Sequence, residues 1–143
     1  MGLPAYNLEP EREELFRQMM HEEVDKWVDE LLSIFDKDSQ PTLMELSERF
    51  TNTRKEFLGA CFQKLIEQKY SFLLEQEYCP CPRCGKSCKR RRISAKELAT
   101  MQGESHLNRP WFYCTDCSEG FSPLDEVLEL SRKKHQFDIQ KKL

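Results

Sequence analysis

Four of the seven cysteines occur as two pairs whose spacing suits a shared metal ion. Two residues separate Cys81 from Cys84, two separate Cys114 from Cys117, and 29 residues lie between the pairs. Thiolates two residues apart can reach one ion when the chain turns tightly between them, and Gly85 supplies the open backbone conformation needed after such a turn. Two pairs complete a tetrahedral shell of four thiolates, as in closed structural zinc sites. We therefore predict one structural Zn²⁺ per chain, bound by these four cysteines.

The neighbouring cysteines leave a second arrangement open. Cys79 and Cys88 flank the first pair, so the four cysteines of this stretch could in principle form a local metal site. That site would leave the Cys114/Cys117 pair unused, and the single residue between Cys79 and Cys81 suits a shared ion poorly. We expect Cys79 and Cys88 to be non-ligand thiols near the site. A catalytic zinc would need an open position and usually histidine or carboxylate ligands, and the pattern suggests neither.

The segment between the two pairs predicts a β-hairpin. KELATMQ (residues 96–102) and SHLNRPWFYC (residues 105–114) are expected to be strands around a turn at Gly103. The second strand then delivers Cys114 to the metal. Residues 78–121 are thus predicted to form a four-cysteine zinc ribbon. A unit of this size cannot bury enough apolar surface alone, and structural zinc can supply on the order of 10 kcal/mol of folding free energy.

Positive charge is concentrated after the first cysteine pair. The net charge is −8 over residues 1–78, +4 over residues 79–122 and +1 over residues 123–143. Four thiolates make the metal site negative and offset part of the basic block, but a surplus remains beside a run of three aromatic residues. Arg and Lys on a rigid face bind phosphates with a strongly salt-dependent affinity. We predict double-stranded DNA as the partner, contacted by Lys86, Lys89, Arg90, Arg91, Arg92, Lys96 and Arg109.

The acidic front part, residues 1–77, is predicted to be a helical region. Apolar side chains recur every three or four positions along residues 10–36, which predicts a helix there. A short helix near residues 42–51 and a longer one near 54–76 are expected next, unless they form one bent helix. Three helices could form a helix-turn-helix DNA reader, but the negative charge of this part would repel phosphate. We expect instead a hairpin or bundle that packs on itself or on a second copy, giving a homodimer.

Single residues of the helical region are expected to have structural roles. Thr42 and Thr53, each followed three residues later by a glutamate, fit capping boxes at helix starts. Trp27 and the phenylalanines are expected in the core, and Cys61 is expected to be a small buried apolar residue. The side chains expected to be solvated are His21 and, in the second ribbon strand, His106.

Residues 122–143 are predicted to form a short C-terminal helix and a tail. Ser122 and Pro123 fit the start of the helix. The carboxylates of Asp125 and Glu126 suit the positive end of the helix dipole and are not expected to be catalytic. Two lysines further on fit the end of the same helix. The last residues, FDIQKKL, have no stop signal, so the chain looks cut where something else would continue.

These elements together predict an α+β fold with an N-terminal α-helical hairpin or bundle, a small four-cysteine zinc ribbon and a short C-terminal helix. No apolar run approaches the roughly 20 residues of a membrane span, and the first residues lack the features of a secretory signal. A cytoplasmic protein is expected, and a reducing cytoplasm disfavours disulfides among its cysteines.

The motifs from the first cysteine pair onward resemble the N-terminal part of bacterial insertion-sequence transposases of the ISKra type. The matching motifs are CPRCGK, the three arginines that follow it, RPWFYC at Arg109–Cys114 and GFSPLDE at Gly120–Glu126. The resemblance extends over about residues 42–143, whereas residues 1–41 match only in being helical.

The resemblance implies DNA binding for transposition, near a bacterial nucleoid, with a Mg²⁺-dependent DDE nuclease domain downstream in the family. No acidic triad can be transferred to this sequence. What transfers is the set of four zinc ligands, Cys81, Cys84, Cys114 and Cys117, and the basic hairpin as a DNA contact. We therefore expect a protein or fragment that binds the ends of the element without cleaving them, with no enzyme activity, no small-molecule substrate and no membrane partner. The alternatives are a zinc-dependent protein-interaction adaptor or regulator derived from a transposase, and an enzyme with an unrecognised metal site.

Overall fold

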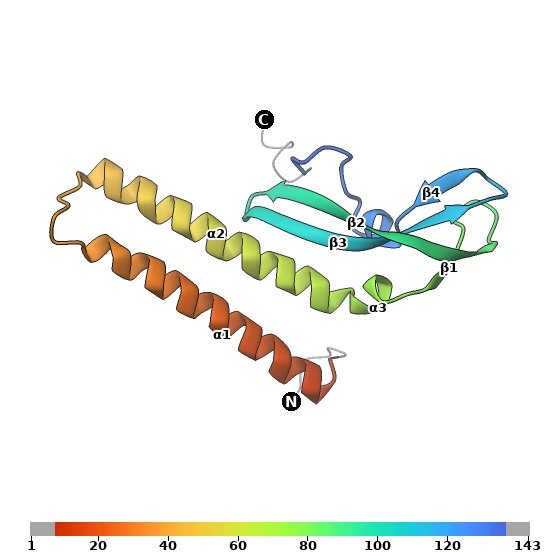
Figure 1. The fold of residues 1–143 in the computed structure, drawn as a ribbon, viewed down its shortest axis with the longest axis horizontal. Coiled ribbons are helices and arrows are strands. Elements are labelled where there is room, and N and C mark those ends of the chain that lie inside the picture. Colours follow the sequence, from red (N-terminus) through yellow and green to blue (C-terminus); the bar gives the residue numbers. More distant parts are fainter. Residues whose placement is uncertain (1–7, 137–143) are drawn as a thin grey trace, which may run out of the picture.

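Two long helices and an antiparallel sheet are stacked in three layers in this computed structural model, which describes residues 8–136 (Figure 1). Helix α2 lies between α1 and the sheet. The elements in chain order are α1 Pro10–Leu32, the 3₁₀ turn η1 Ser33–Phe35, α2 Leu43–Lys69, α3 Ser71–Leu74, β1 Tyr78–Pro80, β2 Ser87–Thr100, β3 Gly103–Cys114, β4 Glu119–Phe121 and α4 Pro123–Val127. The mixed helix and sheet content confirms the predicted α+β class. None of the helices in the described range is long and apolar enough to cross a membrane.

Helix α2 is one continuous helix and not the predicted pair. Thr42 caps its start as expected, since its hydroxyl accepts the backbone N–H of Glu45 at 3.2 Å. The second predicted cap, Thr53, is wrong because it lies inside the helix. Its hydroxyl donates to the carbonyl of Phe50 at 2.9 Å and accepts the indole N–H of Trp27 at 3.2 Å. The Thr53 hydroxyl and the Trp27 indole N–H are thus both hydrogen-bonded, and the helix continues through Thr53. The alternative of one helix is therefore correct for residues 43–69.

Helices α1 and α2 contact each other through aromatic stacking and a buried charge. The ring of Trp27 stacks on Phe57 with centroids 4.7 Å apart and an interplanar angle of 10°. Glu23 is 7% exposed, accepts a hydrogen bond from the amino group of Lys26 at 3.2 Å and forms an ion pair with Lys64 at 3.6 Å. Cys61 is buried, as predicted. Pairing leaves the buried carboxylate compensated, so the two helices can pack closely.

The sheet is a meander in which all neighbouring strands are antiparallel, in the order β1-β2-β3-β4. Strands β2 and β3 form the predicted hairpin, with Thr100 opposite Gly103 and Gly103 at a φ of +113°. Strand β2 starts at Ser87, so the basic block is part of a strand, and the short strands β1 and β4 were not predicted. The chain returns to the edge of β2 near its end, where Ala99 exchanges backbone hydrogen bonds with Lys134 and Gln136.

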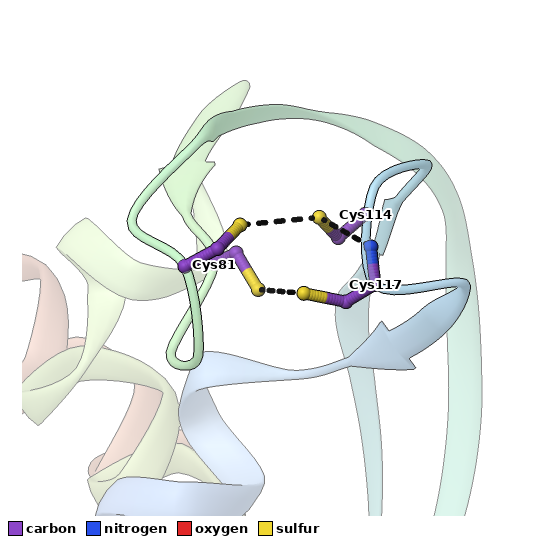
Figure 2. A group of neighbouring side chains, drawn as sticks. Cys81, Cys114 and Cys117 are labelled. Carbon is purple, nitrogen blue, oxygen red and sulfur yellow. Dashed lines mark hydrogen bonds between the residues drawn. The ribbon is translucent and has the colours of Figure 1, made fainter.

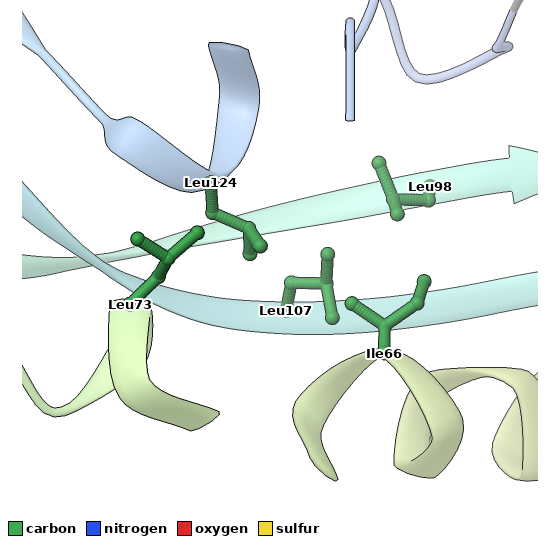
Figure 3. Packing of buried hydrophobic residues seen from close by; sticks show 5 residues of the cluster. All are labelled: Ile66, Leu73, Leu98, Leu107 and Leu124. Carbon is green, nitrogen blue, oxygen red and sulfur yellow. The ribbon is translucent and has the colours of Figure 1, made fainter. Parts of the chain in front are cut away.

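The main hydrophobic core joins all three predicted segments of the chain. Ile66 and Leu73 come from the helices, Leu98 and Leu107 from β2 and β3, and Leu124 from α4 (Figure 3). Leu98, Leu107 and Leu124 are each 1% exposed. Burying a side chain of this size stabilises a protein by about 1.5–3 kcal/mol. This core fixes the sheet and α4 on the C-terminal part of α2.

Helix α2 and strand β3 approach so closely at Gly59 that a side chain would not fit. A Cβ atom added to Gly59 would overlap the backbone carbonyl of Glu104, and the hydroxyl of Ser105 donates to the Gly59 carbonyl at 2.7 Å. We expect Gly59→Ala to destabilise the protein by about 1–3 kcal/mol, because the helix must move away from the strand. Urea denaturation followed by circular dichroism measures this. Asn52→Ala, at an exposed position of the same helix, is the control, and equal midpoints would contradict the prediction.

The C-terminal helix is shorter than predicted. Helix α4 ends at Val127, and the Ser122 side chain makes no capping hydrogen bond. Lys133 and Lys134 lie beyond the helix, so their predicted place at its end is wrong. Lys134 instead forms an ion pair with Glu104 at 2.8 Å. The tail FDIQKKL lies outside the described residues.

Candidate metal centre and basic strand

Two similar turns present the cysteine pairs. In the first, the N–H of Cys81 donates to the carbonyl of Lys86 at 2.8 Å, and Gly85 has a φ of +76°. In the second, Ser118 occupies the matching position after the second cysteine, with a φ of +53°. Each turn also directs one backbone N–H at a sulfur atom, from Arg83 to Cys81 and from Cys117 to Cys114, both at 3.4 Å. Such contacts stabilise thiolates.

The four predicted ligands form one cluster (Figure 2). The sulfur atoms of Cys81, Cys84, Cys114 and Cys117 all lie within 4.8 Å of one another. Those of Cys81 and Cys117 are 3.8 Å apart, and those of Cys84 and Cys114 are 3.6 Å apart. A tetrahedron with metal–sulfur distances of about 2.3 Å has edges of about 3.8 Å. The four cysteines are thus positioned to hold a metal ion, and the described residues contain no disulfide.

The sulfur atoms of the cluster influence each other's protonation. The backbone N–H of Cys117 lowers the pKa of the Cys114 thiol to about 7. The contact with Cys84, followed by burial, raises the pKa of Cys117 to about 12. One thiolate is therefore favoured, whereas the neighbouring thiol retains its proton. A bound cation would offset the repulsion between thiolates and release the remaining protons.

Cys79 and Cys88 lie next to the cluster without belonging to it. They are directly opposite each other in the β1–β2 ladder. The Cys88 thiol is 4% exposed and donates to the carbonyl of Lys86 at 3.2 Å. Within residues 8–136, the candidate metal group contains the two distant pairs and neither of these cysteines. The structure therefore does not favour the local four-cysteine alternative.

A small apolar cluster packs against the metal centre. Phe112 on β3 is completely buried and stacks on Phe121 of β4, with ring centroids 5.6 Å apart. Both rings pack with the buried cysteines Cys81, Cys88 and Cys114. This cluster is separate from the main core and lies at the other end of the β2–β3 hairpin.

The basic block lies on the first half of β2, where cationic side chains cover aromatic rings of β3. Arg91 is 4.5 Å from the centre of the Tyr113 ring, and Arg92 is 5.8 Å from the centre of the Trp111 ring. An irregular register between Arg90 and Arg92 places an extra residue in β2 at this point. Lys89, Arg91 and Tyr113 are among the residues that line a shallow groove of about 310 Å³.

The predicted basic residues differ in how accessible they are. Those that are exposed are Lys86, Lys89, Arg91 and Arg92. Arg90 and Lys96 are half-buried. The amino group of Lys86 also contacts Asp116 at 3.2 Å, and that of Lys96 donates to the carbonyl of Arg132 at 3.2 Å. The exposed set is thus concentrated at the metal end of β2.

Arg109 does not share this surface, in contrast to its predicted role as a DNA contact. Arg109 is 6% exposed, and its guanidinium forms a bidentate ion pair with Asp125 at 2.7 and 2.8 Å. It also donates to the carbonyl of Ser94 at 3.0 Å. All three guanidinium nitrogens donate to partners within the protein, the carboxylate of Asp125 and Ser94, so the group is engaged in the fold. Arg109 therefore connects β3 to α4 and β2. His106, by contrast, is exposed as predicted.

Comparison of the chain with protein-family models, with curated proteins and with solved structures found no match. The functional argument therefore rests on the geometry of the cysteine cluster and on the charge beside it.

Proposed function

We propose that the protein is a DNA-binding protein whose recognition surface is a zinc ribbon, with Zn²⁺ bound by Cys81, Cys84, Cys114 and Cys117. Thiolate ligands in a closed tetrahedral set are typical of structural zinc, so the ion would stabilise the fold and take no part in a reaction. The single observation that supports the function best is the group of exposed cations on the strand next to this site.

The electrostatic pattern supports DNA over a neutral partner. Lys89, Arg91 and Arg92 are held on a β-hairpin that a metal ion would stiffen, and two of them already lie against aromatic rings. Ordering flexible cations before binding lowers the entropy lost on association. The acidic helices lie in other layers of the fold and would repel the phosphates of DNA. DNA would therefore bind only at the basic strand.

A salt titration tests this proposal. We expect log K for a DNA duplex to fall linearly with log salt, and we expect the variant K89A/R91A/R92A to reduce the slope by about 3, because each lost phosphate contact reduces it by about 1. The control is R132A/K133A, which removes two exposed cations away from the metal centre, one fewer than the test variant. Affinity that is absent at low salt, or that falls equally in both variants, would refute the proposal.

We further propose, on the quoted motifs, a relation to the N-terminal region of ISKra-type transposases, with binding to the ends of an element. The test compares duplexes from the ends of the neighbouring genetic element with unrelated duplexes of equal length. Tighter binding to the ends is expected, together with no nicking when Mg²⁺ is added. Equal affinity for all duplexes would remove the element ends as the target while leaving general DNA binding intact.

A second candidate function is that of a protein-interaction adaptor. It is favoured by the exposed apolar side chains of the helices, among them Leu32, Phe35 and Leu43, which are 58%, 80% and 84% exposed. Under this alternative, the salt titration would show little affinity for duplex DNA at low salt.

A further inference from the structure

Two cysteines outside the metal cluster face each other across a pair of strands. Cys79 on β1 and Cys88 on β2 are directly opposite in the antiparallel ladder. Side chains of directly opposite residues project from the same face of a sheet. Cys79 also packs against the small apolar cluster that contains Cys88. The two thiols are therefore neighbours, and the candidate metal group uses neither of them.

The backbone around the two cysteines suits a disulfide bond. The N–H of Arg90 donates to the carbonyl of Glu77 at 2.7 Å, and the N–H of Cys81 donates to the carbonyl of Lys86 at 2.8 Å. These hydrogen-bonded pairs lie two residues to either side of the opposed cysteines. Because such pairs recur at every second position of an antiparallel ladder, the opposed cysteines are also a hydrogen-bonded pair, with Cα atoms about 5.5 Å apart. The Cα atoms of disulfides are usually about 4.4–6.8 Å apart.

A disulfide at this position is expected to be strained and therefore easily reduced. The Cβ atoms of opposite residues are about 4.5–5.5 Å apart, at the upper end in hydrogen-bonded pairs. A disulfide brings its Cβ atoms to about 3.8 Å. Closing the bond thus pulls the two strands together locally. Strained disulfides have more oxidising potentials than structural ones and are typical of reversible, regulatory bonds.

Backbone carbonyls hold both thiols while they are reduced. The Cys88 thiol donates to Lys86 at 3.2 Å, and the Cys79 thiol donates to Pro80 at 3.7 Å. A rotation of each side chain about its Cα–Cβ bond replaces these weak hydrogen bonds by a bond between the sulfurs. Cys88 is 4% exposed, whereas Cys79 is half-buried. An oxidant in solution therefore reaches Cys79 first.

We propose that Cys79 and Cys88 form a reversible disulfide, with a low-molecular-weight disulfide as the oxidant. The Cys79 sulfur attacks one sulfur of the oxidant, whose S–S bond breaks, and the first small thiol leaves with the Cys79 proton. The Cys88 sulfur then attacks the Cys79 sulfur of this mixed disulfide, and the second small thiol leaves with the Cys88 proton. The protein loses two electrons and two protons, and the oxidant gains both.

The bond closes a loop that carries the first two candidate ligands, since Cys81 and Cys84 lie between the two linked positions. A disulfide that closes a loop lowers the entropy of the opened chain. The oxidised β1–β2 pair therefore keeps the first ligand turn formed, and a bound metal ion leaves it more slowly. This inference goes beyond DNA binding and does not depend on it. The DNA titration uses the reduced chain, so the two proposals can fail independently.

Thiol counting on the full, zinc-loaded chain tests the bond. The protein is incubated with oxidised glutathione, then unfolded in a chelator and alkylated with iodoacetamide, and its mass gives the number of alkylated thiols. We expect the loss of two alkylatable thiols per chain, a peptide link between Cys79 and Cys88, and one zinc retained. Dithiothreitol should restore both thiols.

Single variants test the assignment of the bond. Cys79→Ser and Cys88→Ser should each lose at most one alkylatable thiol, because the remaining cysteine can only carry a glutathione. Cys61→Ser is the matched control, since Cys61 is buried on α2, and it should still lose two. An unchanged thiol count in the wild-type chain, or a link from Cys79 or Cys88 to Cys114, would overturn the proposal.

Zinc transfer to a chelator tests the effect on the ligand turn. We expect release from the oxidised wild-type chain to be about tenfold slower than from the reduced chain, because the closed loop keeps both ligands together. The same treatment should leave the release rate of Cys79→Ser unchanged. Equal or faster release from the oxidised wild-type chain would show that the bond does not hold the turn.

Discussion

Replacing Cys114 with serine is expected to abolish stable metal binding and to unfold the metal end of the sheet. The Cys114 sulfur accepts a backbone N–H and lies among the other three thiols of the candidate metal group, which in the described residues includes neither Cys79 nor Cys88. Structural zinc contributes on the order of 10 kcal/mol in small zinc-dependent units. We expect the zinc content after dialysis to fall from one per chain to near zero, while the helical circular dichroism signal largely remains.

Cys79→Ser is the matched control for this loss. Cys79 lies two residues from Cys81 and is half-buried, but it is not part of the four-thiol cluster, so its replacement should leave one zinc per chain. Elemental analysis of both variants decides the ligand assignment. Zinc that is lost with Cys79→Ser or Cys88→Ser but kept with Cys114→Ser would contradict it, and two zinc ions per wild-type chain would do the same.

Asp125→Ala is expected to be the most destabilising substitution away from the metal centre. It leaves the buried guanidinium of Arg109 without its carboxylate, and breaking a buried ion pair from one side costs about 3–5 kcal/mol. We expect the lower end of this range, because the Asp125 side chain is 26% exposed and Ser94 still accepts a hydrogen bond. The urea midpoint measures the loss.

Asp116→Ala provides the comparison for a surface ion pair. Asp116 contacts Lys86 at 3.2 Å, but both side chains are largely in water, so the urea midpoint should hardly change. Replacing both members of the buried pair, as in R109M/D125L, should recover much of the stability because no unpaired charge remains. If Asp125→Ala cost no more than Asp116→Ala, the connecting role of Arg109 would be wrong.

The cysteine cluster was the most predictable part of the molecule. Two CxxC pairs and a tight turn ending at Gly85 are local features that the sequence displays directly. Their convergence requires only that the hairpin between them closes, and its strands were recognisable. The matching left-handed position in the second turn is held by Ser118, and no glycine marked it.

Other features depend on contacts between distant residues and could not be predicted. Arg109 belongs by type and position to the basic set, and only its pairing with Asp125, 16 residues later, removes it from the surface. The start of β2 has no apolar alternation, because few of its side chains there reach a core. Thr53 looked like a helix start because its partner, Trp27, is far away in the sequence.

The β2–β3 hairpin belongs to two separate cores, and this limits how the protein can be divided. Its turn end packs on α2 through Leu98 and Leu107, whereas its other end surrounds the thiols with Phe112. Leu98 and Leu107 are each 1% exposed in the whole protein. A fragment limited to residues 78–121 would expose both side chains to solvent and would aggregate even with its metal bound. The smallest piece able to fold by itself therefore includes α2 at one boundary and α4 at the other.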